Sequence, residues 1–225
     1  PYVAMTTRVM AAFGVVTTQP DPTTWAVAPQ MYRGTDYRIE PDASAASYVF
    51  AAAVIVGGSV LVHGLGADAL QGDLAFVDVL ERMGARVERT AAGTVVSSDG
   101  PLRGIEADMA DISDTAQTLA VVAAFAEGPT RVTGIGFIRG KETNRIHAVV
   151  TELRRLGIDA EEEPDGFVVR PGPIGPGVVQ TYDDHRMAMA FALIGLRVPG
   201  IQISDPGCVS KTFPGFFDEL RRLSA

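Results

Sequence analysis

Several cationic side chains lie close to the starts of predicted helices. Each lies at such a start or within one turn of it, and these cations are Lys141, Arg145, Arg186 and Lys211. The helix dipole disfavours positive charge at this end by ~0.3–1 kcal/mol for each cation. A bound anion would offset this cost, because helix N-termini and cationic side chains both attract it. We therefore expect a site for phosphate or carboxylate, and the alternative is a set of solvated surface cations.

Two carboxylates accompany these cations. Glu142 lies between Lys141 and Arg145, which would keep it ionised while it exchanges a proton with a bound substrate. Asp114 precedes another predicted helix and is followed three residues later by Gln117, which is a capping-box arrangement. A purely structural N-cap is therefore an open alternative for Asp114. If both acids face the anion site, they suit a reaction that moves protons.

The other reactive side chains have simpler interpretations. His185 is predicted to be a structural histidine that faces Asp184, and Asp183 and Asp184 can cap the helix that follows them. The single cysteine, Cys208, is predicted to be a small buried hydrophobic residue beside Gly207. One cysteine excludes an intrachain disulfide, and the widely spaced histidines form no local metal motif.

The composition is typical of a globular protein. The chain has 225 residues, of which 47% are hydrophobic and 20% charged, and its formal net charge is -8. This charge disfavours a general affinity for nucleic acid or for an anionic membrane. No apolar run approaches the ~18 residues that span a bilayer, and no signal peptide opens the chain, so we expect a cytoplasmic location. Because the sequence starts at Pro1, we expect a fragment or a processed product.

A recurring pattern along the chain predicts the fold. Asp42, Asp114 and Asp184 mark equivalent positions that are 72 and 70 residues apart. Each copy is predicted as a strand, an apolar helix, a strand and an amphipathic helix, and the first two copies end in a pair of strands. Such βαβαββ units cannot bury their faces alone, so they should stack around a shared helical core. The alternative is a generic α/β domain with coincidental periodicity.

Each copy of the repeat predicts its own set of strands and helices. The first copy has strands at 37–40, 59–63, 86–89 and 94–97, a helix that follows residue 42 and runs to 56, and a helix at 73–83. The second has strands at 104–107, 130–135, 159–162 and 167–170, a helix that follows residue 114 and runs to 126, and a helix at 144–156. The third has strands at 178–181 and 201–204 and helices at 183–196 and 213–223. It lacks a closing strand pair, which another segment must supply. Residues 1 to about 36 do not fit the repeat and are predicted as a helix at 3–13 and short strands.

Four segments carry a resemblance to the EPSP synthase family. They are KETNR at 141–145, TYDDHRMAM at 181–189, DPGC at 205–208 with KTFP at 211–214, and DASAASY at 42–48. They resemble the family motifs K-E-T-D-R, T-Y-N-D-H-R-M-A-M, D-P-x-C-x-x-K-T-F-P and D-A-S-S-A-S-Y. The match runs in one register from Pro1 to the C-terminus, and long motifs in the same order are highly specific.

The resemblance implies a fold and a domain organisation. Family members have two α/β domains, each an inside-out barrel of three βαβαββ units, which agrees with the repeat. Residues 1–38 would then be the tail of the domain formed by the N-terminal half. Residues 39–225 would be most of the domain that both chain ends form, with the third unit incomplete in this chain.

The resemblance also implies a reaction and residue roles. The family transfers the enolpyruvyl group of phosphoenolpyruvate to the 5-hydroxyl of shikimate 3-phosphate and releases phosphate. Asp114 would be the base for that hydroxyl, and Glu142 would exchange a proton with the phosphoenolpyruvate methylene. The phosphoenolpyruvate contacts would be Arg145, Arg186 and Lys211, and the shikimate-phosphate contacts would be Tyr2 and Lys141. No metal or organic cofactor is expected, because fixed cations can stabilise the phosphate leaving group.

Two positions depart from the family pattern. Phe137 stands where many members have an asparagine that contacts the shikimate phosphate, and Asn144 replaces an aspartate, which we expect to matter little. The N-terminal half would be the partner that completes the site, so this chain alone is expected to be inactive, and the complete protein a monomer. Other hypotheses are a UDP-N-acetylglucosamine enolpyruvyl transferase, which we do not expect to carry the 141–145 motif, and a non-catalytic half-enzyme.

Overall fold

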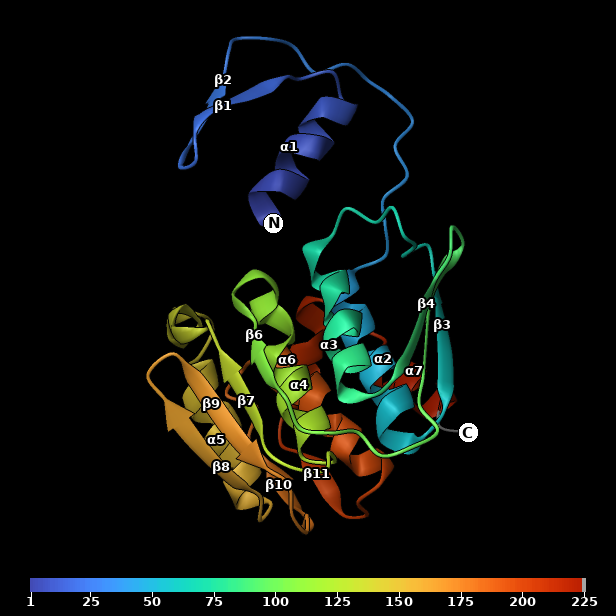
Figure 1. Cartoon of the computed structure of the whole chain (residues 1–225), viewed down its shortest axis with the longest axis vertical. Coiled ribbons are helices and arrows are strands. Elements are labelled where there is room, and N and C mark those ends of the chain that lie inside the picture. The colour runs from blue at the N-terminus through green and yellow to red at the C-terminus, as the bar shows by residue number, and fades with distance from the viewer. Residues whose placement is uncertain (224–225) are drawn as a thin grey trace.

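Helices form the centre of the molecule, and the strands lie outside them (Figure 1). The computed structural model describes residues 1–223 of the chain. The central helices are α2 (Ala43–Val56), α4 (Ala116–Ala123) and α6 (His185–Ala192). Most of their side chains are buried, and sheets lie on either side of them in Figure 1. This layering matches the shared helical core that the repeat predicts.

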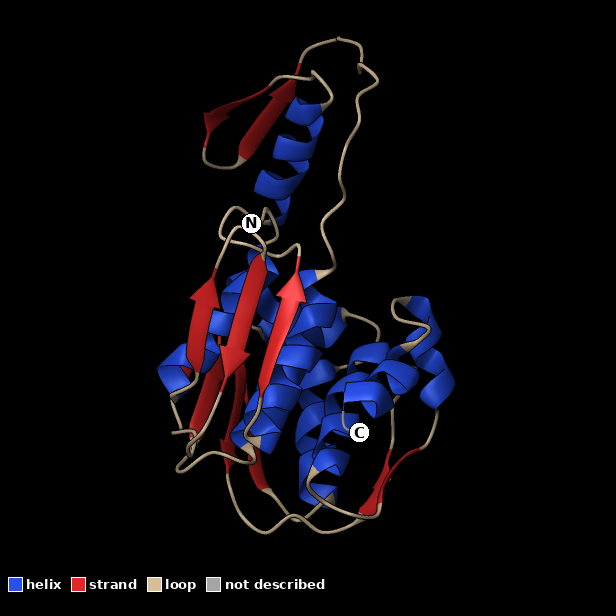
Figure 2. Ribbon diagram, turned by 90° about the vertical axis from the view of Figure 1, so that its right-hand side faces the viewer, coloured by secondary structure: helices blue, strands red, loops and turns tan. Residues whose placement is uncertain are grey.

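The first unit is built around α2. The Asp42 side chain caps this helix by accepting a hydrogen bond from the Ala45 amide at 3.0 Å. Gly57 ends it in the left-handed region (φ 78°), which only glycine adopts without strain. An antiparallel sheet in the order β3-β5-β4 covers this unit, and Figure 2 shows that sheet in front of the helices. The remaining elements are β3 (Ser59–His63), η1 (Gly72–Ala75), α3 (Phe76–Met83), β4 (Arg86–Arg89) and β5 (Gly93–Ser97).

The second unit has a four-stranded sheet in the order β6-β7-β9-β8. β6 and β7 are parallel, whereas β9 is antiparallel to both β7 and β8. The parallel pair requires a helical crossover, which η2 and α4 provide. These elements confirm the predicted order of the second repeat, and their bounds are β6 (Glu106–Asp108), η2 (Ala110–Thr115), β7 (Thr130–Thr133), η3 (Gly136–Gly140), α5 (Arg145–Arg155), β8 (Asp159–Glu163) and β9 (Gly166–Arg170).

The third unit repeats the parallel crossover with fewer strands. In the described chain its sheet contains only the parallel pair β10-β11, whereas the second unit has four strands. The predicted helix at 213–223 begins later than expected, so Lys211 ends a 3₁₀ helix instead of starting α7. The bounds are β10 (Gly177–Val179), η4 (Leu193–Leu196), β11 (Ile201–Ile203), η5 (Pro206–Lys211) and α7 (Phe216–Leu223).

The three units share one core, in which α2 contacts α4 and α4 contacts α6. Alanines such as Ala51 and Ala120 are fully buried, and their small side chains allow the helices to approach closely. The hydroxyls of Ser47 and Thr118 meet at 3.2 Å between α2 and α4. Met187 and Met189 of α6 are also buried in this core. None of the described helices combines the length and apolarity needed to cross a bilayer.

The N-terminal segment projects from one end of the main body in Figures 1 and 2, and its N-terminal end lies against that body. It consists of α1 (Tyr2–Ala12) and the antiparallel pair β1 (Thr17–Asp21) and β2 (Thr24–Val27), and none of the residues of α1 is buried. An irregular stretch, residues 28–42, joins it to α2.

The predicted strand at 37–40 is wrong, because this stretch is irregular. This stretch is fixed by a side chain and not by the backbone hydrogen bonds of a sheet. The Glu40 carboxylate accepts hydrogen bonds from the Leu70 amide at 2.7 Å and from the Gln71 side chain at 3.1 Å. Pro41, which follows it, lacks the amide hydrogen that a strand would donate. The domain boundary near residue 38 stays a prediction.

Candidate active site

The strand-to-helix junctions that carry the predicted site residues lie close together in the structure. Asp114 lies in the last turn of η2, Arg145 begins α5 and Arg186 lies in the first turn of α6. Arg186 Nη2 lies 2.7 Å from Asp114 Oδ2, and Arg145 Nη1 lies 3.2 Å from Asp114 Oδ1. The crossovers of β6-β7 and β10-β11 are parallel, so these junctions fall at the same edge of the fold. The predicted clustering of the cations around two acids is present, and we call this group the charged cluster: Asp114, Lys141, Glu142, Arg145, Asp184, Arg186 and Lys211.

Arg145 lies at the centre of the charged cluster. Only 1% of its side chain is exposed, so its guanidinium must be paired within the protein. Nε contacts Asp184 Oδ2 at 2.7 Å, Nη2 contacts Glu142 Oε2 at 2.7 Å, and Nη1 reaches Asp114. Three carboxylates therefore hold the planar guanidinium along its edges and fix its orientation.

Asp114 accepts hydrogen bonds from three cations. They come from Lys141, Arg145 and Arg186. The capping-box interpretation is wrong, because α4 begins at Ala116 and, within the described chain, its N-cap position makes no side-chain capping bond. Burial alone would raise the pKa of Asp114, but Arg186, Lys141 and Arg145 together hold it below its usual range. The carboxylate is therefore ionised while these cations face it.

Glu142 lies at the outer rim of the charged cluster. Lys211 Nζ contacts its Oε1 at 2.7 Å, and Arg145 contacts its other oxygen. The hydrogen bond from Lys211 is the largest cause that lowers the pKa of Glu142, to about 2, with a further contribution from Arg145. Lys211 keeps 57% of its side chain exposed, Glu142 keeps 30% and Lys141 keeps 29%, so these three side chains are the most accessible part of the cluster to solvent and to a ligand.

Asp184 has a larger role than the sequence indicated. It caps α6 by accepting a hydrogen bond from the Arg186 amide at 2.9 Å, as predicted, and it also pairs with buried Arg145. The cap was recognisable from the position of Asp184 before a helix, whereas nothing local in the sequence indicated the contact with Arg145. The interpretation of His185 is wrong in part: the ring is buried, but its Nδ1 has no hydrogen-bond partner among residues 1–223. Burial and the neighbouring Arg186 lower the pKa of His185.

Tyr2 lies beside the charged cluster but is bonded elsewhere. Its hydroxyl donates to Asp73 Oδ1 at 2.9 Å, and Ser44 donates to the other oxygen of Asp73. Burial and the contact with Asp73 raise the pKa of Tyr2, so the phenol keeps its proton. Asp73 is almost completely buried and was not among the predicted site residues. The contact ties α1 to η1, which no periodicity in the sequence could indicate.

Residues near the rim of the charged cluster show the consequences of the two departures from the family pattern. Phe137 is 58% exposed, and its ring lies 5.7 Å from Lys141 Nζ, so it shields the cation but offers no hydrogen bond. Asn144 caps α5 by accepting a hydrogen bond from the His147 amide at 3.1 Å, which is the role that an aspartate would also fill.

Cys208 is half-buried instead of fully buried, and its thiol donates a hydrogen bond to the Asp205 carbonyl.

The charge balance of the cluster favours anions. Four cations face three carboxylates, so the group carries one net positive charge in a chain whose net charge is -8. A ligand phosphate or carboxylate can compete with the carboxylates for the outer cations, because both bind guanidinium and ammonium groups in the same way. Among residues 1–223 no group of three His, Cys, Asp or Glu side chains has the arrangement of a metal site.

Sequence comparison identifies the family. The family model for EPSP synthase (3-phosphoshikimate 1-carboxyvinyltransferase) matches residues 1–220. The chain belongs to the EPSP synthase family. Curated relatives named 3-phosphoshikimate 1-carboxyvinyltransferase include one from Nostoc punctiforme, 51% identical over 223 residues, and one from Methanosphaerula palustris, 45% identical over 219 residues. These alignments cover 99% and 97% of this chain but 52% of each relative. The chain therefore spans about half the length of the EPSP synthases that it matches.

Solved structures confirm the fold expected of an EPSP synthase. A solved structure of EPSP synthase from Acinetobacter baumannii is 27% identical and superposes with a TM-score of 0.83 over 96% of this chain and 53% of that one. The enolpyruvyl transferase NikO from Streptomyces tendae, 23% identical, superposes with a TM-score of 0.73 over 97% of this chain and 52% of that one. The α/β fold of repeated units is thus an enolpyruvyl-transferase fold. The charged cluster contains residues of the 141–145 and 181–189 motifs that carried the family resemblance.

Proposed function

We propose that the complete protein transfers the enolpyruvyl group of phosphoenolpyruvate to the 5-hydroxyl of shikimate 3-phosphate and releases phosphate. The observation that carries this proposal is the meeting of Asp114 and Glu142 with four cations in a member of the EPSP synthase family. Both substrates are anionic, and the charged cluster has cations for phosphate and carboxylate groups next to two acids. A purely binding role would not require the two acids.

The proposed reaction assigns a role to each part of the cluster. The 5-oxygen forms a bond to C2 of phosphoenolpyruvate while the methylene gains a proton, and then the C2–O bond to phosphate breaks as the methyl group loses a proton. Arg145, Arg186 and Lys211 would bind phosphoenolpyruvate and stabilise the leaving phosphate. Lys141 and Tyr2 would contact the shikimate phosphate, and for Tyr2 this requires release of its hydrogen bond to Asp73.

The pairing of Asp114 suggests how its basicity is controlled. A base is most effective when its pKa lies near the working pH, whereas cations lower the pKa of Asp114. If substrate phosphates draw Lys141 and Arg186 away, the pKa of Asp114 rises and the carboxylate can accept the hydroxyl proton. Glu142 would exchange its proton with the substrate in the same way when Lys211 turns to phosphate. Binding and proton transfer would then be coupled through the same cations.

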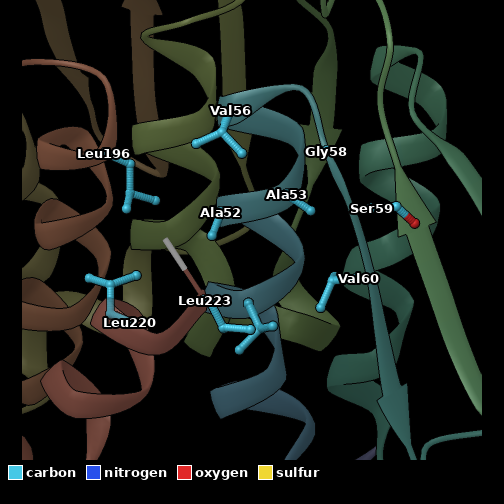
Figure 3. Close-up of a pocket in the computed structure, with 10 residues that line it drawn as sticks. Ala52, Ala53, Val56, Gly58, Ser59, Val60, Leu196, Leu220 and Leu223 are labelled. Carbon is cyan, nitrogen blue, oxygen red and sulfur yellow. The ribbon is translucent and has the colours of Figure 1, made fainter. Parts of the chain in front are cut away.

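We also propose that the rest of the protein completes both the fold and the site. Within residues 1–223 the third unit has two strands where the second has four, so β11 has no described counterpart of the antiparallel neighbour that β7 has in β9. An apolar groove of about 170 Å³ lies between α2, β3, η4 and α7 (Figure 3). Val60, Leu196 and Leu220 line it. The repeat predicts that a strand pair from the remaining half occupies this groove. A cytoplasmic location and a monomeric state of the complete protein stay predictions.

The decisive experiment measures phosphate release from shikimate 3-phosphate and phosphoenolpyruvate. This chain is assembled with the N-terminal half of the protein, and assembly is verified by gel filtration. We expect turnover that is lost in Glu142→Gln and in Lys211→Ala. Arg86→Ala serves as the control, because this cation is 75% exposed, pairs with Asp99 and is not a member of the charged cluster, so turnover should be unchanged.

The outcomes separate the hypotheses. Turnover with UDP-N-acetylglucosamine instead of shikimate 3-phosphate would replace the proposed acceptor. An assembled, folded complex that turns over neither acceptor would contradict an enzymatic role and favour a non-catalytic half-enzyme. If the chain alone releases phosphate at the rate of the complex, the proposal that the other half completes the site is wrong.

A further inference from the structure

The turn that precedes α6 has an unusual backbone. Tyr182 and Asp183 have φ angles of 57° and 56°, and among residues 1–223 they are the only non-glycine residues with positive φ. The Asp184 amide donates to the Thr181 carbonyl at 2.9 Å, which closes a four-residue turn of type I′. Residues with a Cβ disfavour this region, which glycine and, less often, asparagine or aspartate occupy, so Tyr182 is the more unusual of the two. The turn therefore needs support from contacts outside it.

A buried carboxylate provides that support. Glu152 lies on α5, is 0% exposed, and accepts a hydrogen bond from the Tyr182 hydroxyl at 2.7 Å. It also accepts one from the Gln180 amide at 2.9 Å, so it holds the turn by a side chain and by the backbone that leads into it. Arg155, one turn further along α5, neutralises the carboxylate at 2.9 Å. Glu152 belongs to none of the interactions of the charged cluster.

The helix α5 thus contacts the turn at two positions. Glu152 follows Arg145 by seven residues on α5, which places both side chains on the same face of the helix. Arg145 contacts Asp184, the last residue of the turn, while Glu152 contacts Tyr182 within it. Any shift of the turn relative to α5 would change the position of Asp184 and, through the helix that it caps, of Arg186.

We propose that Glu152 is a positioning residue: it holds Tyr182 and Asp183 in the left-handed conformation so that Asp184 keeps Arg145 and Arg186 in place for anion binding. Part of this inference, the effect on turnover, rests on the proposed function. The effect on Arg145 does not, because it concerns only the geometry of this chain. Asp184 links the turn to Arg145 and Arg186.

The protonation state of the Tyr182 phenol agrees with this role. Burial and the neighbouring Glu152 raise the pKa of Tyr182 to about 12, so the phenol keeps the proton that it donates. The hydrogen bond to a carboxylate buried away from water is stronger than one to a neutral acceptor. Tyr182→Phe removes this single bond and keeps the ring, which makes it the cleanest variant. Glu152→Gln removes the charge at similar volume.

The first test measures hydrogen exchange of the Arg145 Nε–H by NMR in this chain. The group is buried and bonded to Asp184, so we expect slow exchange, becoming at least about tenfold faster in Tyr182→Phe and Glu152→Gln. Adding Asp183→Gly to Tyr182→Phe should restore slow exchange in part, because glycine adopts positive φ freely. Tyr32→Phe is the matched control, since Tyr32 is 60% exposed. Unchanged exchange in Tyr182→Phe would overturn the proposal.

The second test uses the complex assembled with the N-terminal half. With Tyr182→Phe, kcat/KM for phosphoenolpyruvate should fall at least about tenfold, as expected for a displaced clamp, while the Asp183→Gly double variant regains part of the loss. A purely structural role of Tyr182 would lower the yield of folded protein and leave kcat/KM of the folded fraction intact, which would contradict the proposal. If the unmodified complex shows no turnover, the proposed function fails, and the exchange measurement still decides the role of Glu152.

Discussion

Replacement of Asp184 by asparagine tests whether the buried ion pair with Arg145 holds the cluster together. Asparagine keeps the size and the ability to cap α6, so the change removes mainly the charge. The pair joins a side chain that is 1% exposed to one that is 0% exposed, with a 2.7 Å contact at Nε and a second contact of 3.4 Å at Nη2. Neither ion can regain water without opening the core.

The size of the effect follows from these contacts. Loss of one partner from a buried pair costs about 3–5 kcal/mol, because the other charge stays buried. Arg145 keeps contacts with Asp114 and Glu142, whose side chains are 20% and 30% exposed, so the lower end applies. We expect Asp184→Asn to lower the free energy of unfolding by about 3 kcal/mol, which for a chain of this length corresponds to a fall in Tm of about 6–12 °C.

The assay is urea unfolding followed by circular dichroism at neutral pH, with thermal unfolding as a second measure. Asp99→Asn is the matched control, because Asp99 pairs with Arg86 on the surface at 72% and 75% exposure and should contribute less than about 1 kcal/mol. A loss for Asp184→Asn that is no larger than the loss for Asp99→Asn would refute the reasoning. Arg145 would then be compensated by the other acids or by water.

Two further predictions concern the rim and the second sheet. Lys211→Ala should raise the pKa of Glu142 from about 2 toward the ordinary 4.5, which a carboxyl-carbon NMR titration measures; an unchanged value would show that Lys211 does not lower it. Because the folded-state pKa is depressed, Glu142 stabilises the fold above about pH 4.5 and this contribution disappears as the pH falls toward 2, so Lys211→Ala should flatten the acid side of the stability profile. Gly166→Ala should destabilise the chain by about 2 kcal/mol, since a methyl group there would overlap the Val132 carbonyl across the β7-β9 pair. Gly172→Ala, with open space around it, is the control in the same unfolding assay, and equal effects would contradict this account.

The elements of the fold were largely predictable because their signals are local. Gly57 and Gly84 end helices where the apolar or amphipathic pattern stops, and the structure places both in the left-handed conformation. The strand at 59–63 has the predicted bounds. The strand at 37–40 failed because its pattern suited a strand, but no neighbouring strand pairs with it within the described chain, and Glu40 holds the segment by its side chain.

The sequence also placed the right residues in one site, although it assigned some of their contacts wrongly. The repeat put Asp114, Arg145 and Arg186 near strand-to-helix junctions, and parallel crossovers bring such junctions to one edge of the fold. The capping box at Asp114 failed because three cations outcompete a local amide for its oxygens. Glu152 and Asp73 escaped notice because each bonds to a residue far away in the chain.

The sequence by itself determined the repeat, the family and the residues that meet at the junctions, because periodicity, helix ends and motif order are all written in neighbouring positions. Only the tertiary structure decided which acid pairs with which cation, that Arg145 is buried, and that the turn at 181–184 is held in the left-handed region by Glu152. The physical reason is that desolvation and ion pairing depend on how α2, α4, α5 and α6 pack, and that packing joins positions tens of residues apart.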